Sequence, residues 1–459
     1  MSSAGDIIRA IGRDPAGDFI LGGASRARIV AMAAALTPKK AASYCLASTD
    51  RELIAAAVLA RLMGGPPLIL PPSLATRDLD QLARSLPGLV LLTAAETITG
   101  QGAALQPNHH PGAPGQQGDE SRGQHAGTVP GFHINHDCLQ RELVRIFTGG
   151  STGLPRIWPK TGMNLLGEAL FLCQHFQITP ADRILATVPP YHIYGLLFSV
   201  LVPLVSGATV LPQQPAFPEE IRTATREHKA TILVSVPPHY QAIASKPLAA
   251  PCLRLAFSSA GPLGEAENQD FTRHNQVPVI EVFGSTETGG IGSRNRFAGE
   301  EGFTPFAPVA WREKDGLLLV RSPFLSPELP VDQDGWFRTS DRVRSLGKGV
   351  FLPLGRADSI AKVGGKRVDL EEIRTTIRDL AEVRDCVVLS LPDAGGRGER
   401  IAALIAGNTD PASLKAQLAG RLPPHAMPRI IRVVANLPTQ ANGKIDRQAI
   451  LDILDHEQN

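Results

Sequence analysis

Cysteine is scarce in this sequence. Its 459 residues include five cysteines, an odd number, and no two of them form a Cys-x-x-Cys arrangement. A disulfide framework needs paired cysteines and a structural zinc site needs closely spaced ligands, so the sequence argues against both as organising features. Scattered free thiols fit the reducing cytoplasm.

Long apolar runs are also missing. Residues 1–13 carry polar and charged side chains where a secretory signal has an apolar segment. The longest apolar stretch, residues 195–212, is interrupted by Pro203 and Gly207, which favours a buried helix and strand over a membrane span. We therefore predict a cytoplasmic protein without stable membrane insertion.

Net charge is low as well. The 46 basic and 44 acidic residues give +2 at pH 7, so there is no electrostatic argument for a nucleic acid or an anionic membrane as partner. The hydrophobic fraction of 43% is ordinary for a globular protein. The chain is too long for one compact core, which predicts two or three domains.

Strand-like and helix-like patterns alternate along the chain. Buried strand patterns recur, with stretches long enough for helices between them, at residues 67–70, 89–92, 184–188, 231–236, 253–258 and 279–283. This spacing predicts an α/β fold with mostly parallel sheets covered by helices. Ligands of such sheets bind beyond the carboxyl ends of the strands, so a site is expected in the loops there.

Two changes in composition divide the chain. Residues 99–130 are rich in Gly, Gln, His and Pro without periodicity, which predicts a mobile loop. After about residue 355 the pattern changes to a shorter α+β set. We predict a large N-terminal domain over residues 1–355 and a small C-terminal α+β domain over residues 356–459.

A glycine-rich segment follows the apolar run 143–147. It reads Thr148-Gly149-Gly150-Ser151-Thr152-Gly153-Leu154-Pro155. Glycine allows close backbone approach, so successive N–H groups can converge on a phosphate, and the hydroxyls add further donors. A P-loop ATPase is excluded because no Lys-Ser/Thr pair follows Gly153. Taken alone, the segment also fits a flexible surface turn.

Two other segments combine hydroxyl, aromatic and acidic side chains. Within residues 281–287, Phe283 can stack on a base, Thr286 can bind a phosphate oxygen and Glu287 can hold Mg²⁺. Within residues 334–341, Asp341 can accept hydrogen bonds from two ribose hydroxyls. The alternative for both segments is an ordinary capped turn.

Two further segments lie in the predicted small domain. Residues 355–367 contain the adjacent glycines Gly364 and Gly365, which suit a bending backbone or close ligand approach, although a charged linker has a similar composition. Residues 438–447 place Lys444 in a glycine turn. A lone lysine in such a turn is usually solvated.

The order of these five segments resembles the adenylate-forming superfamily, which includes acyl- and aryl-CoA synthetases, adenylation domains of peptide synthetases, and luciferases. The resemblance runs from about residue 140 to residue 447. In chain order, the five segments resemble the family's phosphate loop, its aromatic-Gly-x-Thr-Glu motif, its Gly-Trp-x-x-Thr-Gly-Asp segment, its hinge motif and its segment with the catalytic lysine. Each motif alone is weak, whereas five in one order are specific.

The resemblance implies ATP and Mg²⁺ as cofactors in a two-step reaction. A carboxylate attacks the α-phosphate of ATP and forms an acyl-adenylate with release of pyrophosphate; a thiol then attacks the acyl carbon and expels AMP. Lys444 is implied to bridge the carboxylate and the α-phosphate, Thr286 to bind that phosphate, and Glu287 to position Mg²⁺. The implied nucleotide-binding residues are Thr148, Gly149, Gly150, Ser151, Thr152, Gly153, Arg156, Phe283, Asp341 and Arg356.

The same resemblance implies that the small domain rotates between the two steps. Asp358 matches the hinge position, and Gly364 and Gly365 are implied to line the path of the pantetheine arm. The acceptor thiol is CoA or the phosphopantetheine of an acyl carrier protein, and the sequence leaves both open. An exposed basic patch near Arg421–Arg432 would favour an acidic carrier protein.

The expected substrate is an aryl or short hydrophobic carboxylic acid. Residues 189–195, Pro-Pro-Tyr-His-Ile-Tyr-Gly, resemble the histidine-bearing segment of acyl- and aryl-CoA ligases, whereas amino-acid-adenylating domains have an aspartate there. Without that carboxylate the ammonium group of an amino acid would be unpaired. His192 is alternatively a satisfied core histidine. The implied substrate-binding residues are His192, Ser259, Ala260, Gly261 and Gly284.

Two departures from the family pattern bear on catalysis. Arg156-Ile157 stands where the family usually has Lys-Gly, so the charge is kept, and Lys160 is a candidate to share its role. Ser340 replaces the usual glycine before the ribose-binding aspartate. A degenerate member that binds nucleotide or acyl-adenylate as a regulator is the alternative hypothesis, and an intact Lys444 argues against it.

Overall fold

The computed structural model describes residues 3–12, 17–38, 41–93, 134, 136–148, 156–363, 366–392, 399–439 and 445–455. The chain forms two compact units. The first comprises Met1–Ile291, Asn295–Phe297 and Ser322–Leu329, and the second comprises Gly292–Arg294, Ala298–Arg321 and Pro330–Asn459. The predicted mobile loop at 99–130 lies outside the described residues, and the predicted boundary at residue 355 stays a prediction.

The first unit begins with a five-stranded sheet. Its strands, in spatial order, are β3 (Leu89–Leu92), β1 (Ser43–Leu46), β2 (Leu68–Leu70), β4 (Glu142–Thr148) and β5 (Arg156–Thr161). The first four are parallel, and β5 returns antiparallel to β4. The helices of this region are α1 (Ala4–Ile11), α2 (Arg26–Leu36), α3 (Arg51–Leu62), α4 (Thr76–Ser85), α6 (His136–Gln140) and α7 (Gly162–His175).

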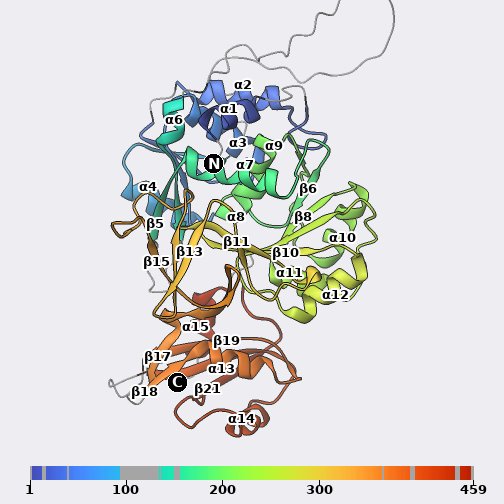
Figure 1. Cartoon of the computed structure of the whole chain (residues 1–459), viewed down its shortest axis with the longest axis vertical. Helices are drawn as coiled ribbons and strands as arrows, with labels where there is room; N and C mark the ends of the chain where they lie inside the picture. Colours follow the sequence, from blue (N-terminus) through green and yellow to red (C-terminus); the bar gives the residue numbers. More distant parts are fainter. Residues whose placement is uncertain are drawn as a thin grey trace, which may run out of the picture. The chain divides into compact units, whose positions relative to one another are not determined.

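The second sheet of this unit is larger and mostly parallel. Its strands follow the order β11 (Gly289–Asn295), β10 (Val279–Ser285), β9 (Leu255–Ser258), β8 (Ile232–Ser235), β6 (Arg183–Ala186) and β7 (Thr209–Val210). The helices α10 (Pro218–Glu227), α11 (Pro237–Ile243) and α12 (Glu265–Asn275) lie along one side of it (Figure 1). Their apolar side chains share one core with alternate residues of the strands, including Leu185, Leu233, Ala256 and Val279.

The apolar stretch 195–212 forms a buried helix and strand, as predicted. It comprises α8 (Ile193–Leu196), a π-helical turn (Leu197–Leu201) and α9 (Val202–Ser206), followed by β7. Gly207 ends the helix with a φ of +82°, a conformation that favours glycine. Among the described residues, none of the helices combines the length and the hydrophobicity that crossing a bilayer requires.

The second unit starts with antiparallel strands. Gly292 and Ser293 of β11 pair with β12 (Thr304–Pro305). Four strands then pair in chain order as β13 (Ala310–Lys314), β14 (Leu317–Arg321), β15 (Phe337–Gly347) and β16 (Val350–Arg356). The sequence patterns did not predict these strands.

The C-terminal part of the second unit is the predicted α+β set. It contains the hairpin β17 (Ile360–Val363) and β18 (Lys366–Asp369), a sheet of β19 (Val383–Pro392), β20 (Glu399–Gly407) and β21 (Ile430–Val434), and the helices α13 (Leu370–Arg378), α14 (Pro411–Ala419) and α15 (Arg447–Asp455) (Figure 1). Alternation along β20 separates two cores: Ile401, Ala403 and Ile405 face the α13 and α14 side, whereas Ala402 and Leu404 share a core with residues of α15. The predicted fold class is confirmed.

Candidate functional site

Parallel pairing gathers predicted site residues at one edge of the larger sheet. β6, β8, β9 and β10 are parallel neighbours in that order, so the segments after their carboxyl ends meet at the same edge. These segments carry His192 after β6, the Ser259–Gly261 stretch after β9, and Thr286 and Glu287 after β10. The structure therefore brings residues from three distant parts of the sequence to one place.

The loop after β10 is closed by its own hydroxyl groups. The Thr288 N–H donates to Ser285 Oγ (3.2 Å), the Ser285 N–H donates to Thr288 Oγ1 (3.1 Å), and the two hydroxyl oxygens are 2.9 Å apart. Thr286, between them, is buried with 7% exposure. This local bonding fixes the loop that presents Glu287.

The carboxylate of Glu287 fits the needs of Mg²⁺. It is half-buried, and among the described residues no group donates a hydrogen bond to it. Mg²⁺ prefers hard oxygen ligands and is commonly held by one or two carboxylates together with substrate phosphates. No cluster of three or more His, Cys, Asp or Glu that could cage a metal occurs in the described part of the chain. A single carboxylate is compatible with the phosphate-assisted mode.

Lys160, on β5, lies under this loop and is fully buried. Its Nζ donates to the carbonyl oxygens of Glu287 (3.0 Å) and Phe324 (2.6 Å). Burial lowers the pKa of Lys160, and the charges of Glu168 and Glu287 oppose that shift. The hypothesis that Lys160 shares the phosphate-binding role of Arg156 is wrong, because its ammonium group is committed to two main-chain carbonyls inside the protein.

The Ser259–Gly261 stretch is anchored to the neighbouring strand. Ser259 Oγ donates to the Val282 carbonyl (2.8 Å), and Ala260 has a φ of +69°, which non-glycine residues rarely adopt. Ala260 and Gly261 are exposed. Packing requires glycine at position 284, since a Cβ there would lie 2.3 Å from the Gly289 carbonyl oxygen, and its role toward the substrate stays a prediction.

His192 is half-buried and precedes α8. Its ring centroid lies 4.5 Å from that of Tyr191, with the planes tilted by 52°. Gly195, in the same segment, allows a tight turn, because a Cβ there would lie 1.9 Å from the Pro189 carbonyl oxygen. The turn sets His192 at the edge where the strands end.

A hydroxyl–imidazole cluster at this edge was missed from the sequence. The Nδ1 of His239 lies 2.8 Å from Thr187 Oγ1 and 3.2 Å from Ser235 Oγ, and the two hydroxyl oxygens are 2.8 Å apart. Burial lowers the pKa of His239, so the ring is neutral at pH 7. The signal was a repeat: Thr187-Val-Pro-Pro directly follows β6, and Ser235-Val-Pro-Pro begins at the last residue of β8.

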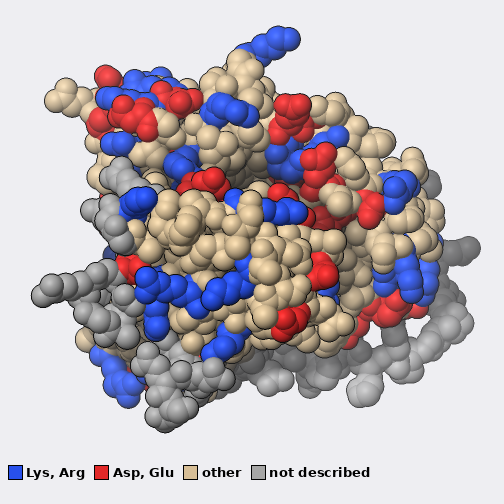
Figure 2. Space-filling model, turned by 90° about the horizontal axis from the view of Figure 1, so that it is seen from below, with Lys and Arg blue, Asp and Glu red and all other residues tan. Residues whose placement is uncertain are grey.

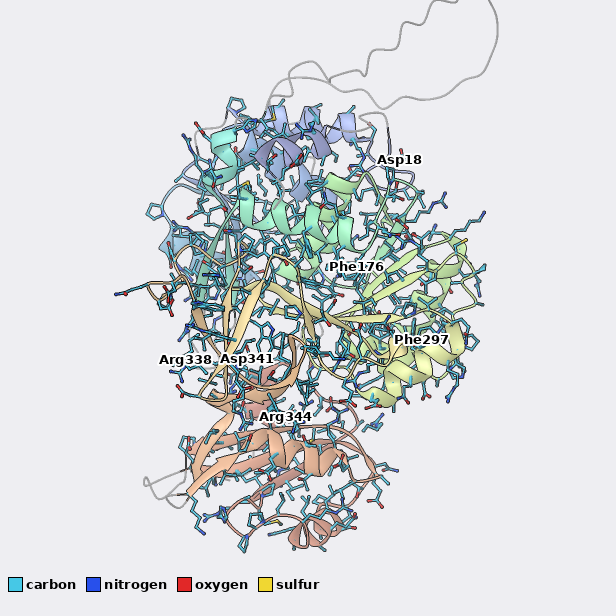
Figure 3. The ribbon with its side chains drawn as sticks, viewed as in Figure 1. Asp18, Phe176, Phe297, Arg338, Asp341 and Arg344 are labelled. Carbon is cyan, nitrogen blue, oxygen red and sulfur yellow. The ribbon has the colours of Figure 1, made fainter. Side chains whose placement is uncertain are left out.

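In the second unit, Asp341 and Arg356 face each other on paired strands. Asp341 on β15 and Arg356 on β16 are register partners, with Arg356 Nη1 3.8 Å from Asp341 Oδ1. Asp341 lies on β15 between Arg338 and Arg344 (Figure 3). The Asp341 N–H donates to Thr339 Oγ1 (3.0 Å). The structure thus brings together the two residues predicted to hold the ribose.

Several predicted site residues cannot be placed. Lys444, Gly364 and Gly365 lie outside the described residues, as does the glycine-rich stretch 149–155. The backbone of Thr148 belongs to β4, and that of Asp358 belongs to the 3₁₀ turn Ala357–Ser359. Arg156 is exposed at the start of β5, directly opposite Thr148. Phe283, on β10, is half-buried.

The basic segment near the C-terminus is partly accessible. Arg421 and Arg429 are exposed, whereas Arg432 on β21 is half-buried. Figure 2 shows Lys and Arg interspersed with Asp and Glu over the visible face. That mixture agrees with the low net charge and gives no support for nucleic-acid binding on this face.

A separate cavity lies elsewhere in the first unit. Its volume is about 300 Å³, and its lining comes mainly from α1, α7 and the residues after α7, including Arg9, Gln174 and Thr179. None of the predicted site residues lines it. The candidate site is therefore the strand edge and not this cavity.

Comparison with known families gives two matches. The family model described as AMP-binding enzyme matches residues 55–309, and the model described as AMP-binding enzyme C-terminal domain matches residues 372–444. The first match alone covers more than half of the chain. The second falls within the C-terminal part of the second unit.

Curated relatives and solved structures agree with this assignment. A sulfoacetate–CoA ligase from Cupriavidus necator is 27% identical over 71% of this chain and 72% of its own length, and an anthranilate–CoA ligase from Pseudomonas aeruginosa is 28% identical over 67% of this chain and 66% of its own. ATP-bound MatB from Rhodopseudomonas palustris superposes with a TM-score of 0.79 at 19% identity, over 98% of this chain and 99% of that one. The anthranilate CoA ligase AuaEII, in complex with anthranoyl-AMP, superposes with a TM-score of 0.72 at 17% sequence identity, over 99% of this chain and 97% of that one. These two likenesses show the fold.

Proposed function

Because this chain belongs to the AMP-binding enzyme family of adenylate-forming acid–thiol ligases, we propose that it activates an aryl or short hydrophobic acid as an acyl-adenylate and transfers the acyl group to a thiol. The observation that carries this proposal is the loop after β10. There, a buried threonine, Thr286, and a carboxylate that accepts no hydrogen bond from the described residues, Glu287, are presented on a backbone that is hydrogen-bonded from beneath. A rigid loop of this kind can hold phosphate and metal without reorganisation.

The roles of the residues follow from their chemistry. The Thr286 hydroxyl donates to the α-phosphate, while the carboxylate of Glu287 supplies an oxygen ligand to Mg²⁺. When bound, Mg²⁺ neutralises charge on the transferring phosphates. Asp341 accepts the ribose hydroxyls, with Arg356 beside it. Lys444 supplies the cation that stabilises the charge developing between the substrate carboxylate and the α-phosphate.

The preference for an acid without an ammonium group rests on the side chains at the ends of β6 and β8. These side chains, from His192, Thr187, Ser235 and His239, are imidazoles and hydroxyls, and His239 is kept neutral by burial. None of the four carries a carboxylate that would pair with a buried ammonium group. Ligases for anthranilate and sulfoacetate among the relatives fit an aromatic or small acid.

The acceptor thiol is CoA or a carrier-protein phosphopantetheine. The exposed side chains of Arg421 and Arg429 give an acidic carrier protein a complementary surface. CoA carries phosphates and would be attracted by the same charges. The two acceptors are separated by supplying each to the enzyme with preformed acyl-adenylate and measuring thioester formation.

ATP–pyrophosphate exchange tests the proposal. The assay uses Mg²⁺ and a panel of benzoates, cinnamates, short fatty acids, sulfonated acids and amino acids, and compares wild type with Lys444→Ala. We expect one acid class to support exchange. In Lys444→Ala the exchange rate should fall by at least ~10²-fold, the loss typical when one transition-state donor is removed. ATP binding without exchange for any acid would instead support the regulator that the Arg156-Ile157 departure suggests.

A further inference from the structure

Two oppositely charged side chains are buried together beneath the Glu287 loop. Lys160 on β5 has no exposed surface, and Glu168 on α7 is 2% exposed. Their charges act on each other, although each makes its hydrogen bonds to the main chain. Burying two charges is costly, and well-packed apolar residues often serve stability as well or better. Their presence calls for a role other than stability.

Both side chains hold the main chain of the same loop. Lys160 Nζ donates to the Glu287 carbonyl (3.0 Å), which also accepts the Ser326 N–H (2.8 Å). Glu168 Oε1 accepts the Gly290 N–H (2.7 Å). The backbone of Glu287 is thereby fixed at its own carbonyl and again three residues later.

The glycines after the loop are matched to this arrangement. Gly289 has a φ of +68°, and a Cβ there would lie 2.7 Å from Glu168 Oε2. That oxygen is buried and has no hydrogen-bond partner among the described residues. The backbone at Gly289 therefore approaches the carboxylate as closely as only glycine permits.

Lys160 also connects the loop with the strand pair that flanks the glycine-rich segment. β4 and β5 are joined by residues 149–155, and Lys160 lies opposite Val144 in their register. From this strand pair the lysine reaches Glu287 and, at 2.6 Å, the carbonyl of Phe324. One side chain thus ties the predicted phosphate-binding hairpin to the predicted metal-binding loop.

We propose that Lys160, with Glu168 as its buried counter-charge, is a positioning residue that sets the backbone of Glu287 so that its carboxylate can hold Mg²⁺. This inference rests on the proposed function, since it assigns Glu287 to the metal. The ammonium group of Lys160 is bonded to two main-chain carbonyls and is assigned to neither the nucleotide nor the acid. It acts through the Glu287 carbonyl, which in turn limits where the Glu287 side chain can point.

The test compares Lys160→Met with the double variant Lys160→Met/Glu168→Gln. Both remove the two donor bonds to Glu287 and Phe324, but the double variant leaves no unpaired charge in the interior. Asn164→Ala is the matched control, because Asn164 Nδ2 donates to the Pro323 carbonyl (2.7 Å) and not to the Glu287 loop. Thermal stability and the Mg²⁺ dependence of ATP–pyrophosphate exchange are measured for each.

We expect Lys160→Met to lower the melting temperature and the double variant to recover much of it. In both, the Mg²⁺ concentration for half-maximal exchange should rise by about 10–100-fold, as is typical when a supporting residue behind a metal ligand is removed. Asn164→Ala should lower stability and leave the Mg²⁺ dependence unchanged. If Lys160→Met does not fold, the Mg²⁺ dependence of the double variant is compared with that of wild type.

A double variant with wild-type Mg²⁺ dependence would overturn the inference, because the pair would then serve stability alone. Failure of the proposed function is distinguishable, since wild type would itself show no exchange. In that case titration calorimetry with Mg·ATP applies the same comparison to binding. A Mg²⁺ dependence of nucleotide binding that is equal in wild type and double variant would again overturn the role of Lys160.

Discussion

Thr286 and Glu287 differ from the polar residues around them, because no hydrogen bond within the described part of the chain engages either side chain. Ser285 and Thr288 bond each other and close the loop, whereas among the described residues no group donates a hydrogen bond to the Glu287 carboxylate. Buried or half-buried polar groups are usually satisfied within the protein. At the residue scale, the proposal therefore rests on a carboxylate and a buried hydroxyl whose hydrogen bonds are not made by the described residues.

Replacing Thr286 tests this assignment directly. Thr286→Val keeps the shape and removes the hydroxyl, so ATP–pyrophosphate exchange should fall by ~10²-fold, the scale of one lost oxyanion donor. Thr286→Ser keeps the hydroxyl and should retain most of the activity. Equal loss in both variants, measured with the preferred acid at saturating ATP, would assign Thr286 to packing.

Asp182 provides a prediction on pH and stability. Burial raises the pKa of its carboxyl, but hydrogen bonds from Arg254, the Thr179 N–H and Thr231 outweigh burial, and the net pKa is lowered. A folded-state pKa below the unfolded value of about 3.9 contributes stability that is present above that value and lost as the pH falls through the folded pKa. Wild type should therefore lose its stability advantage over Asp182→Asn in acid.

Urea unfolding at several pH values measures this difference. At pH 7 Asp182→Asn should destabilise by roughly 2–3 kcal/mol, below the full cost of breaking a buried pair because Arg254 is partly exposed. Asp270→Asn is the control: its exposed pair with Arg273 should contribute less than about 1 kcal/mol. A difference that persists undiminished down to pH 3 would contradict the assignment.

At the scale of elements, the turn from β10 to β11 depends on Gly289. Gly289→Ala places a Cβ at 2.7 Å from Glu168 Oε2 and 2.8 Å from Phe324 Cβ, in addition to the strain of a positive φ. Gly299→Ala has the same kind of φ, +78°, with nothing within 4 Å of the new Cβ. Gly299→Ala should lower the free energy of unfolding by about 1–2 kcal/mol, because only the strain of alanine at a positive φ contributes.

The comparison of these two variants isolates the packing term. Gly289→Ala should lower the free energy of unfolding, measured with denaturant, by more than Gly299→Ala does. Of the two variants, only Gly289→Ala should raise the Mg²⁺ concentration that ATP–pyrophosphate exchange requires. Overpacking typically adds about 1–3 kcal/mol. Equal losses in the two variants would mean that the loop can yield to the added methyl group without disturbing Glu168.

For the whole molecule, the predicted rotation of the small domain makes Asp358 a test position. Proline fixes φ near −65°, so Asp358→Pro should hinder a change of backbone angles at the hinge. We expect ATP–pyrophosphate exchange to persist while thioester formation slows. Ser345→Pro, on a paired strand, would disturb folding instead and serves as the contrast. Parallel loss of both half-reactions in Asp358→Pro would argue against the hinge.

Much of the fold could be predicted from local patterns. The strand expected at 253–258 is β9 (Leu255–Ser258), and the strand expected at 279–283 is β10 (Val279–Ser285). β9 is buried along its whole length and β10 over its first residues, so a short apolar run marks each of them in the sequence. β15 could not be found in this way, because it alternates poorly and is half exposed, with several charged residues. Its stability comes from pairing with β14 and β16.

The sequence by itself determined the chemistry available to this protein and its order along the chain: the glycine-rich segment, Thr286 and Glu287, Asp341 and Lys444. Those residues are recognisable because their types and spacing suit nucleotide and metal. Only the tertiary structure decided that Lys160 and Glu168 serve the loop and not the phosphate. They contact residues 127 and 122 positions away. The packing of sheets and helices decides which main-chain groups lie next to a buried charge. Local sequence patterns do not predict those long-range contacts.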